Sequence, residues 1–384
     1  MSSSRPSNTC SLNVIQENAS KLCSNEFDIG NVVVNKMKVA VAMSGGVDSS
    51  VTALLLKQMG YEVVGVTGWL VKSGSRCCDT AMVDAAKVCE QIGIEHHVVD
   101  LLLSFKTRVM DEFPKSYAAG RTPLPCSLCN TEIKWGSLYN YATKVLGANY
   151  LATGHYAKIM DNNGQLVLAK GIDLTKDQSY VLWGITQEQL AHTLLPLGDY
   201  TKDEIRKIAI DNHLETANRP ESQDLCFIPK GQTIKDYLAN HIPVNVGDII
   251  HIQSKAKLGS HDGFHNFTIG QRKGLNIAFN EPLYVVRLDS VTNTVYVGSK
   301  ADLLQKELTA SECNWLIDMN TAISFTGMAK IRYNANSQLA TIFPLPDNKV
   351  RVEFDTPQPA ITSGQVLAVY DLNDKNLILG GWID

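Results

Sequence analysis

The stretch that most constrains the fold of this chain runs from Met37 to about Thr153, where two kinds of apolar segment alternate. Short runs such as "MKVAVAM" are typical of buried strands, and longer runs such as "VTALLLKQMG" are typical of helices. Strands that alternate with helices predict a parallel sheet with helices on both faces. We therefore expect an α/β fold for this part of the chain.

After about residue 218 the pattern changes to one short helical segment, followed by short apolar strands separated by Gly, Asn and Asp. Evenly spaced short strands of this kind are typical of a small β-barrel. We expect a first domain over residues 37–218, a small central domain over 219–283 and a C-terminal β-barrel over 284–384.

The N-terminal segment, the hydrophobic runs, the net charge and the cysteine content narrow the class of protein further. Residues 1–36 are rich in Ser and Asn, which favours a disordered extension over the alternative, a targeting segment. No apolar run approaches the roughly 20 residues of a membrane span, so no membrane partner is expected. The net charge is −4, so a nucleic acid would need a local basic patch. Nine cysteines without a secretory segment indicate a reducing compartment, expected to be the cytoplasm, or an organelle if the extension is a transit peptide.

The loop "SGGVDSS", Ser44–Ser50, follows the first predicted strand and precedes a helix. Its Gly-Gly pair lets backbone N–H groups converge on an anion, and Ser44, Ser49 and Ser50 add hydroxyl donors beside the positive helix end. Asp48 would repel a bare phosphate, so we expect it to help hold Mg²⁺. The loop lacks the Gly-Lys-Ser/Thr of a Walker A motif. It therefore predicts a phosphate or pyrophosphate site of another type, with an ordinary turn as the alternative.

Three cysteines lie in distinctive segments. Cys126 and Cys129 form a C-x-x-C pair just before a predicted helix, a position that lowers the pKa of a thiol. Cys226 lies in the polar stretch "RPESQDLCFIPKG". A single C-x-x-C pair fits half of a zinc site, a redox pair, two cluster ligands or coincidence, so these residues alone leave the chemistry open.

Six motifs occur in one order along the chain: "SGGVDSS", "GRTPLPCSLCN", "ATGHYA", "KDQSY", "ESQDLCFI" and "HNFTIGQRKGL". This set resembles the tRNA-specific 2-thiouridylases of the PP-loop ATP pyrophosphatase superfamily, from about Met37 to the C-terminus. Those enzymes replace oxygen by sulfur at carbon 2 of the wobble uridine in the tRNAs for Lys, Glu and Gln. The resemblance implies ATP and Mg²⁺ as cofactors and the anticodon arm of tRNA as a partner.

The resemblance also implies roles for individual residues. Cys226 would carry sulfur as a persulfide, received from a cysteine desulfurase or a sulfur-relay protein, and Cys129 would be the second catalytic cysteine. The residues that it assigns to ATP are Ala42, Met43, Ser44, Gly45, Gly46, Val47, Asp48, Ser49, Gly68 and Gly154. The residues that it assigns to tRNA are Leu124, Pro125, Cys126, His155, Lys176, Asp177, Gln178, Arg332, Tyr333 and Gln365.

One departure from the family pattern leaves two routes open. Many members have Asp where this chain has Cys126, so the role of that Asp does not carry over. Cys126, Cys129 and Cys226 could instead hold a [4Fe–4S] cluster that binds a sulfide, or less readily a zinc ion. The alternative functions are a PP-loop ligase acting on a small carboxylate and a non-catalytic iron–sulfur or zinc RNA-binding protein.

Overall fold

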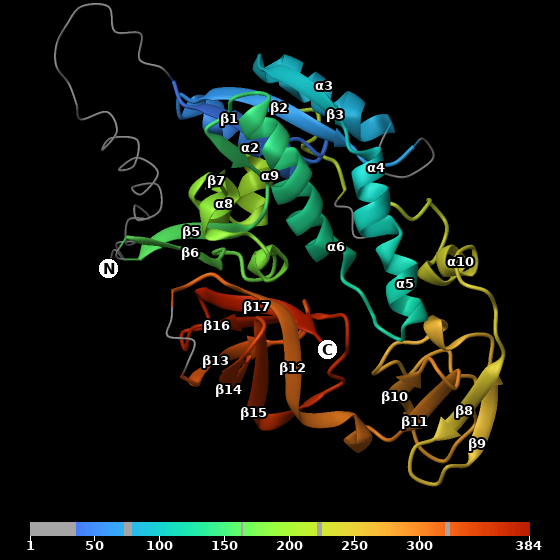
Figure 1. The fold of residues 1–384 in the computed structure, drawn as a ribbon. Coiled ribbons are helices and arrows are strands. Elements are labelled where there is room, and N and C mark those ends of the chain that lie inside the picture. Colours follow the sequence, from blue (N-terminus) through green and yellow to red (C-terminus); the bar gives the residue numbers. More distant parts are fainter. Residues whose placement is uncertain (1–35, 73–78, 163, 221–224, 319–322) are drawn as a thin grey trace, which may run out of the picture.

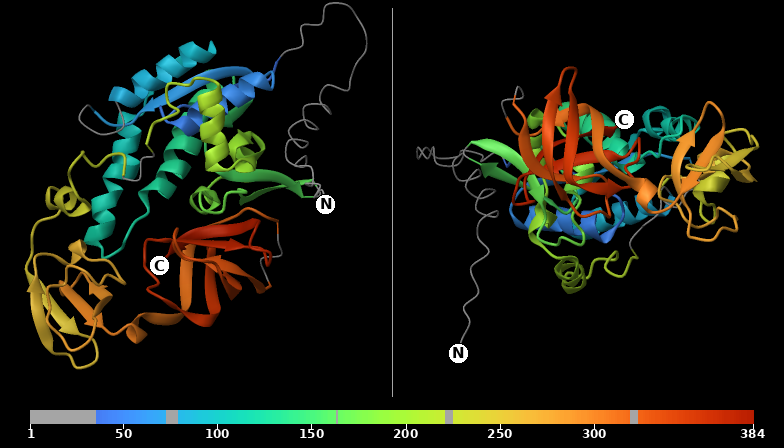
Figure 2. Two further views of the ribbon diagram at one scale, coloured as in Figure 1. Left: turned by 180° about the vertical axis from the view of Figure 1, so that it is seen from behind. Right: turned by 90° about the horizontal axis from the view of Figure 1, so that it is seen from below.

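The computed structural model describes residues 36–384 except 73–78, 163, 221–224 and 319–322. The expected N-terminal extension lies outside these described residues. A parallel sheet with its helices forms one part, and a four-stranded sheet and a barrel lie side by side next to it (Figures 1 and 2). In the part of the chain that the structure describes, no helix has the length and apolar character needed to span a membrane.

The first sheet contains five strands in the order β3-β2-β1-β4-β7. Their bounds are β1 (Lys38–Ala42), β2 (Glu62–Trp69), β3 (Glu95–Asp100), β4 (Tyr150–Ala152) and β7 (Thr193–Leu194). Every pair is parallel, which confirms the predicted α/β class. Because β1 is central, its carboxyl end opens between the ends of β2 and β4, where ligands of such sheets bind.

Side chains of β1 alternate between two apolar clusters, as a buried strand requires. Val39 and Val41 pack on one face against α2 (Val47–Gln58) and α3 (Asp79–Ile92). Ala40 packs on the opposite face, which two long helices cover. Their segments are α4 (Leu102–Phe105), η1 (Lys106–Met110) and α5 (Glu112–Ala118) in the first, and α6 (Pro125–Leu128), η2 (Cys129–Leu138) and α7 (Tyr139–Lys144) in the second.

Shorter elements follow β4. The strands β5 (Ala157–Asn162) and β6 (Gln165–Lys170) form an antiparallel hairpin that turns at Gly164. Helix α9 (Lys202–Asp211) has a capping box, in which Thr201 Oγ1 accepts from Glu204 N and Glu204 Oε2 accepts from Thr201 N. The other helical segments are η3 (Ser179–Leu182), α8 (Gln187–Ala191), η4 (Pro196–Asp199), α10 (Ile234–Ala239), η5 (Phe264–Asn266) and η6 (Ala301–Leu303).

The rest of the chain forms two β-structures. The four-stranded sheet has the order β10-β11-β8-β9, with strands β8 (Gly247–His251), β9 (Lys257–His261), β10 (Tyr284–Asp289) and β11 (Thr294–Gly298). The closed barrel contains β12 (Leu304–Trp315), β13 (Phe325–Lys330), β14 (Gln338–Leu345), β15 (Lys349–Pro359), β16 (Val366–Tyr370) and β17 (Leu377–Ile383). The barrel is confirmed, but it begins at β12 and not at residue 284, because β10 and β11 pair within the central sheet.

The barrel shares an apolar core with the first domain. One cluster joins Tyr180, Leu182 and Trp183 of the first domain to Val366 and Tyr370 of the barrel. The Tyr180 hydroxyl donates to the Val366 carbonyl at 2.6 Å. The barrel is therefore docked on the first domain through a buried seam.

A glycine at this seam gives a test of that docking. A Cβ added at Gly380 would lie 2.3 Å from the Cβ of Trp183, so Gly380→Ala forces the barrel away from its partner. Overpacking of this kind costs about 1–3 kcal/mol, and we expect a lower thermal unfolding midpoint by circular dichroism. The control is Gly259→Ala in β9, where the nearest atom would be 3.9 Å away. Equal midpoints for the two variants would contradict the buried seam.

Candidate nucleotide and sulfur-transfer site

The loop between β1 and α2 has the backbone geometry of an anion site. Gly45 has a φ of +70°, and a Cβ there would lie 2.4 Å from the Ala81 carbonyl oxygen, so only glycine fits. Met43 N donates to Val66 O at 2.8 Å, which extends β1 beyond Ala42 and fixes the start of the loop. The predicted strand–loop–helix arrangement is thus confirmed, and the α2 N-terminus faces the loop.

The serines of the loop have a different use from the one expected. The hydroxyls of Ser49 and Ser50 both donate to the Gly46 carbonyl, at 3.1 and 2.9 Å, and both residues are buried. Ser49 Oγ also accepts from Ser44 N at 3.1 Å. These hydrogen bonds hold the loop in shape, and the backbone N–H groups, the helix end and the exposed Ser44 remain as candidate donors to an anion.

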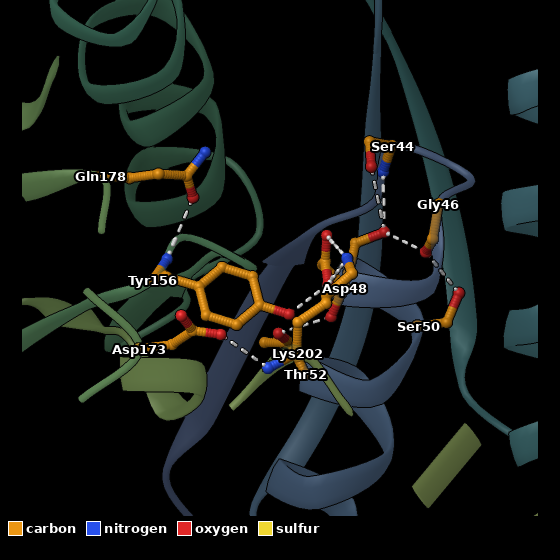
Figure 3. A network of polar contacts seen from close by, with 10 residues as sticks. Ser44, Gly46, Asp48, Ser50, Thr52, Tyr156, Asp173, Gln178 and Lys202 are labelled. Atoms are coloured by element: carbon orange, nitrogen blue, oxygen red, sulfur yellow. Dashed lines mark hydrogen bonds and ion pairs between the residues drawn. The ribbon is translucent and has the colours of Figure 1, made fainter. Parts of the chain in front are cut away.

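Asp48, in the first turn of α2, is the centre of a charged network (Figure 3). Lys202 Nζ donates to both of its carboxylate oxygens, at 2.7 and 2.8 Å, and the Tyr156 hydroxyl donates to Oδ1 at 2.7 Å. Lys202 is buried, with 7% of its surface exposed. The carboxylate expected to help hold Mg²⁺ is therefore already paired with a resident cation.

Sequence analysis missed Lys202 and Tyr156. One signal for Lys202 was available, because it is the first residue of α9, where the positive helix end disfavours a cation. The structure explains the lysine at that position, because its ammonium group pairs with the Asp48 carboxylate. Tyr156 lies in the "ATGHYA" motif, but nothing in the sequence around it indicates a contact with Asp48.

The two distant glycines that were assigned to ATP both lie at strand ends. A Cβ at Gly154 would lie 2.9 Å from the Cβ of Asp48 and from Ser49 N, so this glycine lets the chain after β4 touch the start of α2. A Cβ at Gly68, in β2, would lie 3.1 Å from a methyl carbon of Leu101. Gly154 is therefore a direct neighbour of the loop, whereas Gly68 packs against apolar side chains.

A basic cavity of about 640 Å³ lies beside this network. Its lining includes the basic side chains Lys176, Lys202, Arg206 and Arg219 and the acidic side chains Asp173 and Asp203. The guanidinium of Arg219 also donates to the Gly45 carbonyl and pairs with Asp84 of α3. The cavity thus borders the anion loop. Its four basic side chains can contact phosphate groups, and two of them, Lys202 and Arg219, are already paired with Asp48 and Asp84.

The cysteines lie on the opposite face of the same strand. Pro125 opens the helix at its first turn, where its missing N–H costs nothing. Cys126 is exposed, and Cys129 and Cys226 are half-buried. Both half-buried thiols pack against the apolar cluster that contains Ala40 and borders Ala42. The fold therefore brings Cys129, Cys226 and the end of β1 to one cluster.

The ligand set expected for a cluster or zinc is not assembled. Among the residues that the structure describes, no three His, Cys, Asp or Glu side chains are grouped as metal ligands. Cys126, Cys129 and Cys226 thus do not present the three thiolates that a cluster would need.

The expected lowering of the thiol pKa is wrong for Cys126. Desolvation by the surrounding chain raises the pKa of this thiol, and the nearby charge of Lys134 only partly offsets that effect. The raised pKa favours the protonated, uncharged thiol at Cys126.

Matches to known proteins cover nearly the whole described chain. Family models match at residues 37–230 (described as a tRNA methyl transferase HUP domain), 235–299 (tRNA methyl transferase PRC-barrel domain) and 305–383 (aminomethyltransferase beta-barrel domain). The tRNA-specific 2-thiouridylase MnmA of Trichormus variabilis is 45% identical over 348 residues, which is 90% of this chain and 98% of that protein. The protein of the same name from Picosynechococcus sp. is 46% identical over the same shares. The chain belongs to the tRNA-specific 2-thiouridylase family.

Solved structures add only a weak likeness. The U34-tRNA thiolase NcsA from Methanococcus maripaludis, solved with its [4Fe–4S] cluster, is 22% identical and gives a TM-score of 0.34. The match covers 56% of this chain and 69% of that protein. A likeness at this level carries no argument about the chemistry of this chain.

Several residues assigned to tRNA are engaged inside the protein. His155 is buried, with Thr153 Oγ1 at 2.7 Å from Nδ1 and Lys134 Nζ at 3.2 Å from Nε2. Because an ammonium group can only donate, Nε2 accepts and the proton resides on Nδ1. Burial, together with the charge of Lys134, lowers the pKa of His155 well below its usual range. His155 is thus a neutral residue that orients Lys134.

The "KDQ" triplet is divided between the surface and the interior. Lys176 lines the basic cavity, whereas Asp177 is buried and accepts from Gly171 N and Ser179 N at 3.2 Å each. Gln178 Oε1 accepts from Tyr156 N at 3.0 Å.

The remaining tRNA assignments border the seam between the first domain and the barrel. Gln365 Nε2 donates to Thr122 O at 2.8 Å, just before Leu124 and the Cys126 helix. Arg332 Nη2 donates to Pro359 O at 2.8 Å, and Tyr333 is 38% exposed. Tyr333 thus offers an exposed ring, while Arg332 and Gln365 also bind backbone carbonyls.

The buried His155 gives a pH prediction. Its folded-state pKa lies below the ordinary value of 6.5, so below that pH the unfolded chain binds a proton that the folded chain does not. The unfolding free energy should therefore fall as the pH drops below 6.5, by at most about 1.4 kcal/mol per pH unit from this group. His155→Gln should remove that part of the slope in urea unfolding between about pH 7 and 5. Parallel slopes for the two proteins would show that His155 is protonated in the fold.

Proposed function

We propose that this protein is an ATP-dependent tRNA 2-thiouridylase, which acts on the wobble uridine of the tRNAs for Lys, Glu and Gln. The observation that carries the proposal is the single apolar cluster that receives Cys129 and Cys226 and borders Ala42, the last residue before the nucleotide loop. An activated base and a sulfur carrier must meet, and this arrangement would let both reaction partners meet at one strand end. The relatives' names support the same assignment.

ATP activates the base. The carbon-2 oxygen of uracil is a poor leaving group, so it attacks the α-phosphorus of ATP, which forms an adenylated base and releases pyrophosphate. The backbone N–H groups of the loop and the α2 end would hold the phosphates. The cavity lined by Lys176, Lys202, Arg206 and Arg219 would take the charge of the departing pyrophosphate.

Mg²⁺ fits the site through one carboxylate. The ion is commonly held by one or two protein carboxylates together with substrate phosphates, and Asp48 supplies one at the loop. Its bond to Lys202 means that the two cations would share or exchange this carboxylate. Bound Mg²⁺ would neutralise charge on the pyrophosphate.

Sulfur transfer would then use the two half-buried thiols. The terminal sulfur of a Cys226 persulfide attacks carbon 2, and AMP leaves with the original oxygen. The Cys129 thiolate attacks Sγ of Cys226, which releases 2-thiouridine and leaves a Cys129–Cys226 disulfide that an external dithiol reduces. A cysteine desulfurase or sulfur-relay protein would reload Cys226. These steps need thiolates, so we place the protein in a reducing compartment, the cytoplasm.

The anticodon arm would lie along the first domain and the barrel. The wobble base must leave its stack to reach Cys129, which costs a few kcal/mol. The half-buried Lys176 at the basic cavity and the exposed Tyr333 near the seam would offset this cost through phosphate contacts and stacking.

The central test is product formation. Incubation with unmodified tRNA, Mg-ATP and a persulfide donor should give 2-thiouridine by nucleoside mass analysis. Cys129→Ser and Cys226→Ser should each abolish it, because serine neither carries sulfur nor resolves a persulfide. The control Cys313→Ala removes a thiol buried in the barrel core and should retain thiolation. No thiolated nucleoside in the presence of active relatives as positive controls would favour a ligase that acts on a small carboxylate.

A second test separates the persulfide from a cluster. The three thiols do not form a ligand set among the described residues, so iron-free enzyme should be as active as enzyme purified without oxygen. Cys126→Asp restores the common D-x-x-C form and should keep thiolation without iron. Loss of activity on iron removal, regained only with reconstituted iron and sulfide, would contradict the persulfide route.

A further inference from the structure

Residues 176–180 connect the barrel to the nucleotide loop. Asp177 braces this segment, since its Oδ1 accepts from two backbone N–H groups and its Oδ2 accepts from Ser179 Oγ at 2.9 Å. The backbone path is therefore fixed from within. We call residues 176–180 the strut.

One end of the strut is bound to the barrel. Ser179 Oγ lies 2.9 Å from the hydroxyl of Tyr370 in β16, and Tyr180 donates to Val366 O in the same strand. Because Ser179 uses its own proton on Asp177, Tyr370 donates to Ser179. All of these groups are buried, so breaking the bonds would leave polar atoms without partners.

The other end of the strut reaches Asp48 through one residue (Figure 3). Gln178 N donates to Tyr156 O at 2.9 Å, and Gln178 Oε1 accepts from Tyr156 N at 3.0 Å. This pair of bonds fixes the Tyr156 backbone, and the Tyr156 hydroxyl donates to Asp48 at 2.7 Å.

We propose that Gln178 is a positioning residue that, through Tyr156, fixes Asp48 at the nucleotide loop and so ties base adenylation to the docked barrel. The proposal rests on the thiouridylase function proposed above. The amide of Gln178 has two ends with two roles. Its oxygen holds Tyr156, and its NH₂ group points away from Tyr156 (Figure 3). The NH₂ group is therefore the end that would serve the tRNA contact which the family resemblance assigns to Gln178.

Two substitutions separate these roles in tRNA-dependent ATP–pyrophosphate exchange. Gln178→Ala removes the oxygen, so kcat should fall about tenfold as Asp48 loses its fixed position. Gln178→Glu keeps an oxygen for Tyr156 N and replaces the NH₂ group with a second oxygen. It should keep kcat within about twofold of wild type and raise the KM for tRNA.

A matched control and a double variant exclude a general structural effect. Gln187 donates to Leu166 O and to Leu316 O of the barrel at the same seam, without a bond to the nucleotide loop. Gln187→Ala should leave kcat unchanged. Tyr156→Phe should lower kcat, and combination with Gln178→Ala should add little to that loss, since both act on Asp48 by one route.

Equal loss of kcat in Gln178→Ala and Gln178→Glu would overturn the inference, as would a Gln178→Ala enzyme changed only in its KM for tRNA. Losses in kcat that multiply in the double variant would also overturn it. If the proposed function is wrong, the wild-type protein will release no pyrophosphate with any tRNA. That result differs from the outcomes above, and it would also remove this inference.

Discussion

The site depends on the ion pair between Asp48 and Lys202. The positive end of α2 favours the half-buried Asp48 carboxylate, and this carboxylate compensates the buried Lys202 ammonium, which the positive end of α9 disfavours. The pair joins α2 to α9, and Tyr156 adds the chain after β4. Three segments far apart in the sequence are therefore held at the loop by one charged contact, and the close packing of Gly154 on Asp48 leaves room for it.

The two chemistries of the proposed reaction use the two faces of one strand. The alternation of β1 sends Val39 and Val41 to the helices on the loop side and Ala40 to the cluster that packs Cys129 and Cys226. Both faces end at the carboxyl end of β1, so a nucleotide held by the loop and a thiol held by the cluster would both lie near this end of the strand. A parallel sheet supplies this convergence from geometry alone.

Local features of this structure were predictable from the sequence, and long-range ones were not. The strand–loop–helix at Ser44–Ser50, the hairpin at Gly164 and the Thr201 capping box each depend on residues close in the chain. The pairing of β10 and β11 with the central sheet depends on which strands meet, and short alternating strands look alike. The family resemblance located Cys129 and Cys226 but not Lys202, whose role appears only when α9 reaches α2.

The replacement of Asp by Cys126 changes the charge balance around Lys134. A carboxylate at that position would be ionised and would pair with the lysine. The thiol, with its raised pKa, stays neutral. Lys134 then retains its bond to the neutral ring of His155, and its charge is left to act on the surroundings of the C-x-x-C helix. The charge of Lys134 in turn lowers the pKa of the Cys126 thiol, but by less than burial raises it. With a neutral thiol at position 126, the Lys134 ammonium has the His155 ring as a hydrogen-bond partner, whereas an ionised carboxylate there would attract the same ammonium.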